Sequence, residues 1–161
     1  MKIQISLLFL GQINLRKGIA RLIEAMRLLK DKPIHLTLAG PCEIDSSSWA
    51  DLPNVEWLGS VPRSEVGRLY ENADVFILPT LSDGYAITQL EALSRGLPVI
   101  ASAHCGAAVD EGVNGWILAD LEPETIADAI TRARVENLKP VSAGSGFTPD
   151  ELGQSLVDLI C

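Results

Sequence analysis

The fold is decided by the stretch VFILPTLSDGYAITQLEALSRGLPVIAS, residues 75–102. It begins with an apolar run, Val75–Leu78, and passes through a polar turn into residues 87–95, which are predicted to form a helix. A second apolar run, residues 98–101, follows. Both runs are short and continuously apolar, which is typical of strands buried on both faces of a parallel sheet. The stretch therefore predicts a parallel strand–helix–strand unit.

The same alternation fills the rest of the chain. The apolar runs predicted as strands are residues 6–10, 34–39, 55–58, 75–78, 98–101 and 116–118. Apolar residues at helical spacing or helix-start signals predict helices over residues 18–30, 64–72, 87–95, 123–134 and 148–160. This pattern predicts a doubly wound, Rossmann-like parallel α/β sheet. We interpret residues 1–161 as a single domain.

Composition narrows the classes of partner. The chain is 47% hydrophobic with a formal net charge of −8, so neither nucleic acid nor an anionic membrane is expected as a main partner. Three cysteines without CxxC spacing and two distant histidines make a metal site and a disulfide framework unexpected, and favour a reducing, cytoplasmic setting. The apolar opening, residues 1–10, is interpreted as a strand, and no run approaches the roughly 20 residues of a membrane-spanning helix.

A first candidate site is GQINLRKG, residues 11–18, which joins the first predicted strand to the first helix. Gly11 allows a ligand close to the backbone, and the helix start offers unpaired N–H groups that favour phosphate. Arg16 and Lys17 add positive charge. The alternative is a tight turn with surface cations, because no established phosphate-binding fingerprint occurs here.

A second candidate site lies in residues 79–98. Asp83 follows a strand and Glu91 lies about one turn into a helix, so both are expected to face one cleft. A carboxylate accepts two hydrogen bonds from a vicinal diol, which suits ribose or hexose recognition. The alternative makes Asp83 a turn residue and Glu91 a solvated surface acid. Paired carboxylates also occur in glycoside hydrolysis, but no second feature supports it.

Four segments in order resemble the C-terminal domain of family 4 retaining glycosyltransferases of the GT-B fold. They are FLGQINLRKG, NVEWLGSVPRSEVGRLYENADVFILPT, SDGYAITQLEALSRGLPVIAS and EGVNGWIL, and they cover nearly the whole chain. The resemblance implies binding of a nucleoside diphosphate sugar as donor substrate, with no metal or other cofactor, and transfer of its hexose with retention of configuration.

The resemblance also implies roles for individual residues. Gly11 and Lys17 meet the donor diphosphate, with Lys17 stabilising the departing group. Gln12 stands where the family has a basic residue, so either Arg16 compensates or phosphate binding is weaker.

Two glutamates of the family, with seven residues between them, correspond to Asp83 and Glu91. The second is implied to hold the donor ribose, and the first, here a shorter acid, to hold the transferred sugar as a catalytic residue. Main-chain contacts to sugar, phosphate and base are implied at Gly59, Val61, Gly84, Tyr85, Ala86 and Ile87. The loop 102–111 departs most from the family pattern.

The resemblance further implies a partner, an N-terminal acceptor-binding half that this chain lacks. Residues 147–161 resemble the helix that crosses back to that half, and any membrane association is expected only through it. Alternative functions stay open: a non-catalytic nucleotide-sugar sensor or subunit, a GT-B sugar-nucleotide epimerase, or a flavodoxin-like binding module.

Overall fold

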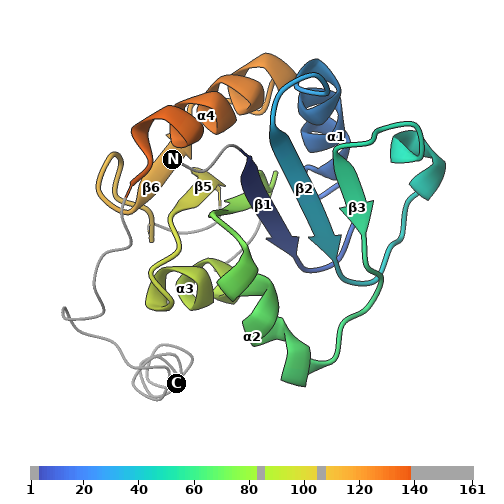
Figure 1. The fold of residues 1–161 in the computed structure, drawn as a ribbon, viewed down its shortest axis with the longest axis horizontal. Helices are drawn as coiled ribbons and strands as arrows, with labels where there is room; N and C mark the ends of the chain where they lie inside the picture. The colour runs from blue at the N-terminus through green and yellow to red at the C-terminus, as the bar shows by residue number, and fades with distance from the viewer. Residues whose placement is uncertain (1–3, 83–85, 105–107, 139–161) are drawn as a thin grey trace.

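A computed structural model describes residues 4–82, 86–104 and 108–138. Its centre is a six-stranded sheet in the order β3-β2-β1-β4-β5-β6, and every neighbouring pair is parallel (Figure 1). The strands are β1 (Ile5–Leu10), β2 (Ile34–Ala39), β3 (Val55–Trp57), β4 (Val75–Leu78), β5 (Val99–Ser102) and β6 (Gly115–Leu118). The predicted doubly wound parallel sheet is confirmed.

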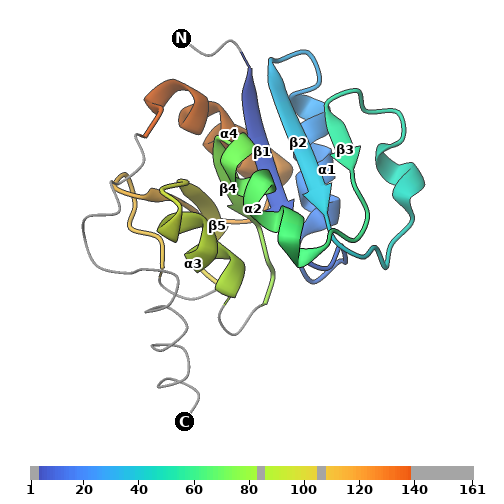
Figure 2. The same ribbon diagram turned by 60° about the horizontal axis from the view of Figure 1, so that its bottom comes forward.

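Helices cover both faces of the sheet. Figure 1 shows α1 and α4 on one face and α2 and α3 on the other, and Figure 2 brings the second face forward. The bounds are α1 (Ile19–Leu28), α2 (Arg63–Asn72), α3 (Ile87–Ser94) and α4 (Pro123–Glu136). A short 3-10 turn, η1 (Ser46–Trp49), was not predicted, and the helix expected over residues 148–160 lies outside the described residues.

The core lies between the sheet and the two helical layers. All residues of β4 and β5 are buried, as their continuous apolar runs predicted. The largest fully buried side chains include Phe9, Phe76 and Trp116. None of the described helices is long and apolar enough to cross a membrane.

Helix α1 begins and ends for local reasons. Gly18 adopts φ +73° and ψ 17° at its amino end, a left-handed conformation that glycine tolerates without Cβ strain. Leu22 and Met26 are completely buried, as helical spacing predicted. At Leu29 the backbone leaves the helix, with φ −101° and ψ 9°, so α1 ends two residues before the predicted Lys30.

The order of the strands fixes where a ligand site is expected. Connections run outward from β1 through β2 to β3, and then restart on the other side of β1 at β4. In open parallel sheets, ligands bind in the crevice expected beside such a reversal, at the carboxyl edge of the sheet. The described segments beside it are residues 11–18 after β1 and residues 79–82 directly after β4.

Candidate functional site

The loop after β1 is held by backbone hydrogen bonds to the end of β2 and the residues that follow it. The amide of Gly11 donates to the Ala39 carbonyl at 3.0 Å, and the Ile13 amide donates to the Pro41 carbonyl at 2.8 Å. The Asn14 side chain accepts a 3.0 Å hydrogen bond from the amide of Lys17. These contacts hold the main chain of the loop at the carboxyl edge, next to the end of β2.

The amino end of α1 carries no capping side chain and no acid in its first turn. The uncapped N–H groups and the helix dipole make this ten-residue helix favourable for an anion. Lys17 directly precedes the cap residue Gly18 and is half-buried, whereas Gln12 and Arg16 are exposed. The loop therefore combines a fixed backbone, a helix terminus and positive charge.

The loops after β1 and β4 are joined directly. The carbonyl of Arg16 accepts hydrogen bonds from the Thr80 hydroxyl at 3.2 Å and from the Leu81 amide at 2.8 Å. A Cβ on Gly18 would lie 1.8 Å from the Pro79 carbonyl oxygen, so only glycine permits this approach. The two segments that the sequence indicated as candidate sites thus meet at the crevice.

The end of β3 is held to the same edge. The Gly40 amide donates to the Gly59 carbonyl at 2.8 Å, and a Cβ on Gly40 would lie 1.9 Å from the Gly11 carbonyl oxygen. The Trp57 indole donates to the Gly40 carbonyl at 3.0 Å. The loop that begins at Gly59 and contains the half-buried Val61 therefore lies on the β3 side of the loop after β1.

Glu91 lies in α3 and is half-buried, not a fully solvated surface acid. Its Oε2 accepts a 3.0 Å hydrogen bond from the Tyr70 hydroxyl, which comes from α2. Burial, and then the negative charge of Glu91, raise the pKa of Tyr70, so this hydroxyl stays protonated at neutral pH. The contact places a fixed carboxylate between the two helices of one face.

The other predicted residues of the second segment divide into two groups. Ala86 is buried directly before α3, and the first helical residue, Ile87, is exposed. Asp83, Gly84 and Tyr85 lie outside the described residues. The structure therefore brings Gly11, Lys17 and the start of α3 to one edge.

Sequence reasoning missed two residues that organise this edge. Thr80 is completely buried and bridges the loops, and its own carbonyl accepts a 2.6 Å hydrogen bond from Ser102. Tyr70 is 2% exposed and orients Glu91. A buried hydroxyl requires a hydrogen-bond partner, so the signals in the sequence were a tyrosine in α2 and a threonine two residues after the apolar run of β4.

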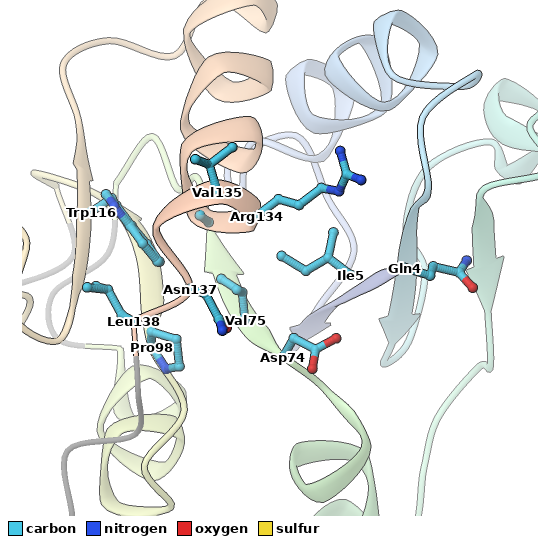
Figure 3. A pocket seen from close by; sticks show the side chains of 11 residues that line it. Gln4, Ile5, Asp74, Val75, Pro98, Trp116, Arg134, Val135, Asn137 and Leu138 are labelled. Atoms are coloured by element: carbon cyan, nitrogen blue, oxygen red, sulfur yellow. The ribbon is translucent and has the colours of Figure 1, made fainter. Parts of the chain in front are cut away.

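A cavity of about 210 Å³ lies at the opposite, amino edge of the sheet (Figure 3). Its lining includes Ile5, Asp74, Trp116 and Leu138. The Asp74 carboxylate accepts a 2.8 Å hydrogen bond from the Ser6 amide, and the Asp74 amide donates to the Ser6 carbonyl at 2.8 Å. This acid therefore joins the starts of β1 and β4 and lies far from the crevice.

Comparison with known families identifies the chain. The profile of the family described as glycosyl transferases group 1 matches residues 4–134. The chain belongs to this family. The group 1 chain is 28% identical over 142 residues to the amylovoran biosynthesis glycosyltransferase AmsK of Erwinia amylovora, covering 78% of this chain and 35% of that protein. It is 30% identical over 131 residues to the sulfoquinovosyl transferase SQD2 of Arabidopsis thaliana, covering 77% of this chain and 25% of that protein.

Solved glycosyltransferases share the fold of this group 1 chain. Anabaena Alr3699/HepE in complex with UDP-glucose superposes with a TM-score of 0.76 at 18% identity, covering 98% of this chain and 48% of that one. The C-terminal domain of the group 1 protein LpcC of Francisella tularensis gives a TM-score of 0.73 at 18% identity, covering 95% of this chain and 86% of that one. The chain thus has the fold of a C-terminal GT-B domain, and it spans about a third of the curated relatives it matches.

Proposed function

We propose that this chain binds a nucleoside diphosphate sugar in the crevice at the carboxyl edge and presents it for transfer of the hexose with retention of configuration. The observation that carries the proposal is the junction of the Lys17 loop with the loop after β4, through the Arg16 carbonyl. Membership of the group 1 family and the UDP-glucose complex of a protein with the same fold support it.

The donor diphosphate would lie against the loop 11–18 and the amino end of α1. During transfer, the bond from the anomeric carbon to the diphosphate oxygen breaks and its electron pair stays on that oxygen. Lys17 and the helix terminus stabilise this growing negative charge. The helix dipole contributes about 0.3–1 kcal/mol at an exposed site. A hydrogen bond to a charged group adds about 1.5–3 kcal/mol, so Lys17 carries the larger share.

The two acids, Glu91 and Asp83, would bind different parts of the donor. Glu91 is held as a carboxylate acceptor suited to the vicinal diol of ribose. Asp83 would contact the transferred sugar, and its side chain is shorter than glutamate by one bond of about 1.5 Å. Glu91 therefore determines the affinity for the nucleotide, and Asp83 determines the preference among sugars.

The acceptor would bind to sequence outside this chain, because the chain spans only 35% of a relative such as AmsK. The chain alone is expected to bind donor and to turn it over little. Its three cysteines, which lack CxxC spacing, support a reducing cytoplasmic setting for the reaction. The reaction as proposed needs no metal.

Calorimetric titration tests the proposal directly. UDP, GDP and ADP are titrated into the folded 161-residue chain, first as free diphosphates and then as sugar conjugates. One base is expected to bind in preference to the others, and its sugar conjugate is expected to bind more tightly than the bare diphosphate. Absence of binding for all six ligands, with folding verified by circular dichroism, would overturn the proposal.

A second candidate function is a non-catalytic nucleotide-sugar subunit. It is favoured by Gln12, an exposed neutral residue at the carboxyl edge of β1, where the family resemblance implies a basic residue. Adding a separately produced acceptor-binding half from a related enzyme distinguishes the two. Hexose transfer in the mixture supports the catalytic function, and tight donor binding without transfer supports the subunit.

A further inference from the structure

Tyr70 links the two helices on one face of the sheet. It belongs to α2, is 2% exposed, and extends its hydroxyl to α3, which lies beside α2 in Figure 2. The hydroxyl lies 3.0 Å from Glu91 Oε2 and 3.2 Å from the main-chain carbonyl of Thr88. Both neighbours are acceptors, so the single hydroxyl proton is donated toward them and the charged carboxylate is the stronger partner.

The ring of Tyr70 is fixed independently of this hydrogen bond. It packs against Phe76 with ring centroids 5.9 Å apart, and the Arg95 guanidinium carbon lies over the ring, 5.4 Å from its centroid. Arg95 also lies beside Gly67 of α2, where a Cβ would make an ordinary van der Waals contact of 3.6 Å with Arg95 Nη1. The hydroxyl therefore has a defined position before any ligand binds.

The hydrogen bond leaves Glu91 with free acceptor capacity. A carboxylate offers about four lone-pair sites, and Tyr70 uses one on Oε2. Within the described part of the chain, no hydrogen bond reaches Oε1. A glutamate side chain that is already ordered loses less conformational entropy on binding a ligand than a mobile one.

We propose that Tyr70 is a positioning residue that holds Glu91 in the orientation in which its remaining lone pairs accept the two hydroxyls of the donor ribose. This inference rests on the proposed function, which assigns the ribose diol to Glu91. Tyr70 itself would not touch the donor. The contribution of Tyr70 to binding affinity should therefore appear only for ligands that carry the ribose diol.

The test compares a nucleoside diphosphate with its 2′,3′-dideoxy counterpart. The diphosphate is the one among UDP, GDP and ADP that binds the wild-type chain most tightly. Dissociation constants for both ligands are measured by calorimetry in the wild type and in Tyr70→Phe, Glu91→Gln and the double variant. Tyr70→Phe is the matched change, because it keeps the ring against Phe76 and Arg95 and removes only the hydroxyl.

The wild type is expected to prefer the ribose form by tenfold or more. Tyr70→Phe should reduce this preference about fivefold and leave the affinity for the dideoxy form unchanged. In the Glu91→Gln background, adding Tyr70→Phe should cause no further loss. Thermal unfolding of each variant verifies that the chain remains folded.

Two results would overturn the role of Tyr70. One is an unchanged ribose preference in Tyr70→Phe, and the other is an equal loss of affinity for both ligands, which indicates general damage to the site. A wild type that binds diphosphate without ribose preference would overturn the assignment of Glu91 instead. A folded wild type that binds none of the diphosphates would overturn the proposed function itself.

Discussion

Thr80 and Arg16 lie 64 positions apart in the sequence and are joined by a hydrogen bond of 3.2 Å, from the Thr80 hydroxyl to the Arg16 carbonyl. The Leu81 amide donates to the same carbonyl at 2.8 Å. Because these bonds join the loops after β1 and β4, a shift of one loop moves the other. The crevice at the strand reversal is therefore fixed by backbone contacts before a ligand enters.

Replacing Thr80 with valine tests this junction. The variant Thr80→Val keeps the shape of the buried side chain and removes its donor, so we expect a loss of about 1 kcal/mol in the free energy of unfolding. We also expect the affinity for the bound nucleoside diphosphate to fall at least threefold in a calorimetric titration. Thr80→Ser keeps the hydroxyl and should preserve affinity. Equal affinities of the serine and valine variants would contradict a role for the hydroxyl.

Two glycines with the same backbone conformation form a matched pair. Gly18 has φ +73° and Gly112 has φ +75°, but a Cβ at Gly18 would lie 1.8 Å from the Pro79 carbonyl, and a Cβ at Gly112 would meet nothing within 4 Å. Gly112→Ala should cost about 1–2 kcal/mol for the left-handed conformation alone. Gly18→Ala should lower the free energy of unfolding, measured in urea, by at least twice as much, because the loops after β1 and β4 must separate to admit the Cβ. Equal losses of unfolding free energy in the two variants would show that the close approach of Gly18 to the Pro79 carbonyl does not affect stability.

Lys17 should act on the diphosphate and on no other part of the donor. Lys17→Met removes the charge, and a lost hydrogen bond to a charged group, about 1.5–3 kcal/mol, corresponds to roughly a tenfold or greater loss of affinity for the diphosphate. Affinity for the corresponding nucleoside should stay unchanged. Lys30→Met, two residues beyond the carboxyl end of α1, is the matched control. A comparable loss in both lysine variants would indicate a general charge effect instead of a local contact.

A pH-dependent contribution to stability is expected at the end of α4. The Trp116 indole donates a 2.6 Å hydrogen bond to Glu136, and this bond, with the contribution of Arg132, lowers the pKa of Glu136. A carboxyl with a lowered folded-state pKa stabilises the fold at neutral pH and loses this contribution as pH falls through that pKa. Glu136→Gln should therefore lower the melting temperature more at pH 7 than near pH 3, which lies below the ordinary glutamate pKa of about 4.3.

Asp128→Asn on the same helix is the control for this experiment. Asp128 is exposed, and its substitution should leave the melting temperature nearly unchanged at both pH values. If Glu136→Gln lowers the melting temperature by the same amount at pH 7 and near pH 3, then the shape of the Glu136 side chain, not its ionisation, stabilises the end of α4.

The sequence predicted the sheet well because buried parallel strands leave a simple signal. The predicted strands at Val75–Leu78 and Ile34–Ala39 match the observed ones residue for residue, and the other four differ by one residue at one or both ends. The α1 boundary was less accurate, because Leu29 is apolar at helical spacing but only caps the helix. Periodicity reports which side chains are buried, and it does not report where the backbone leaves the helix.

The site was predictable only in part. Gly11 and Lys17 were indicated by their place between a strand and a helix, and the structure brings their loop to the crevice. The partners that organise it were not indicated, because the Thr80 and Tyr70 contacts join residues 64 and 21 positions apart. Such contacts depend on the strand order, which hydrophobic periodicity does not determine. The roles of Asp83 and Glu91 toward a donor stay predictions.

The location of the donor site is tested by mapping nucleotide binding onto the amide resonances of the isotope-labelled chain. The nucleoside diphosphate that binds in calorimetry is added to saturation, and the shifts of the backbone amide signals are recorded. We predict the largest shifts in residues 11–18, in residues 59–62 and at the start of α3, all at the carboxyl edge. Shifts concentrated instead around the amino-edge cavity, at Val135 and Leu138, would contradict a donor site at the carboxyl edge.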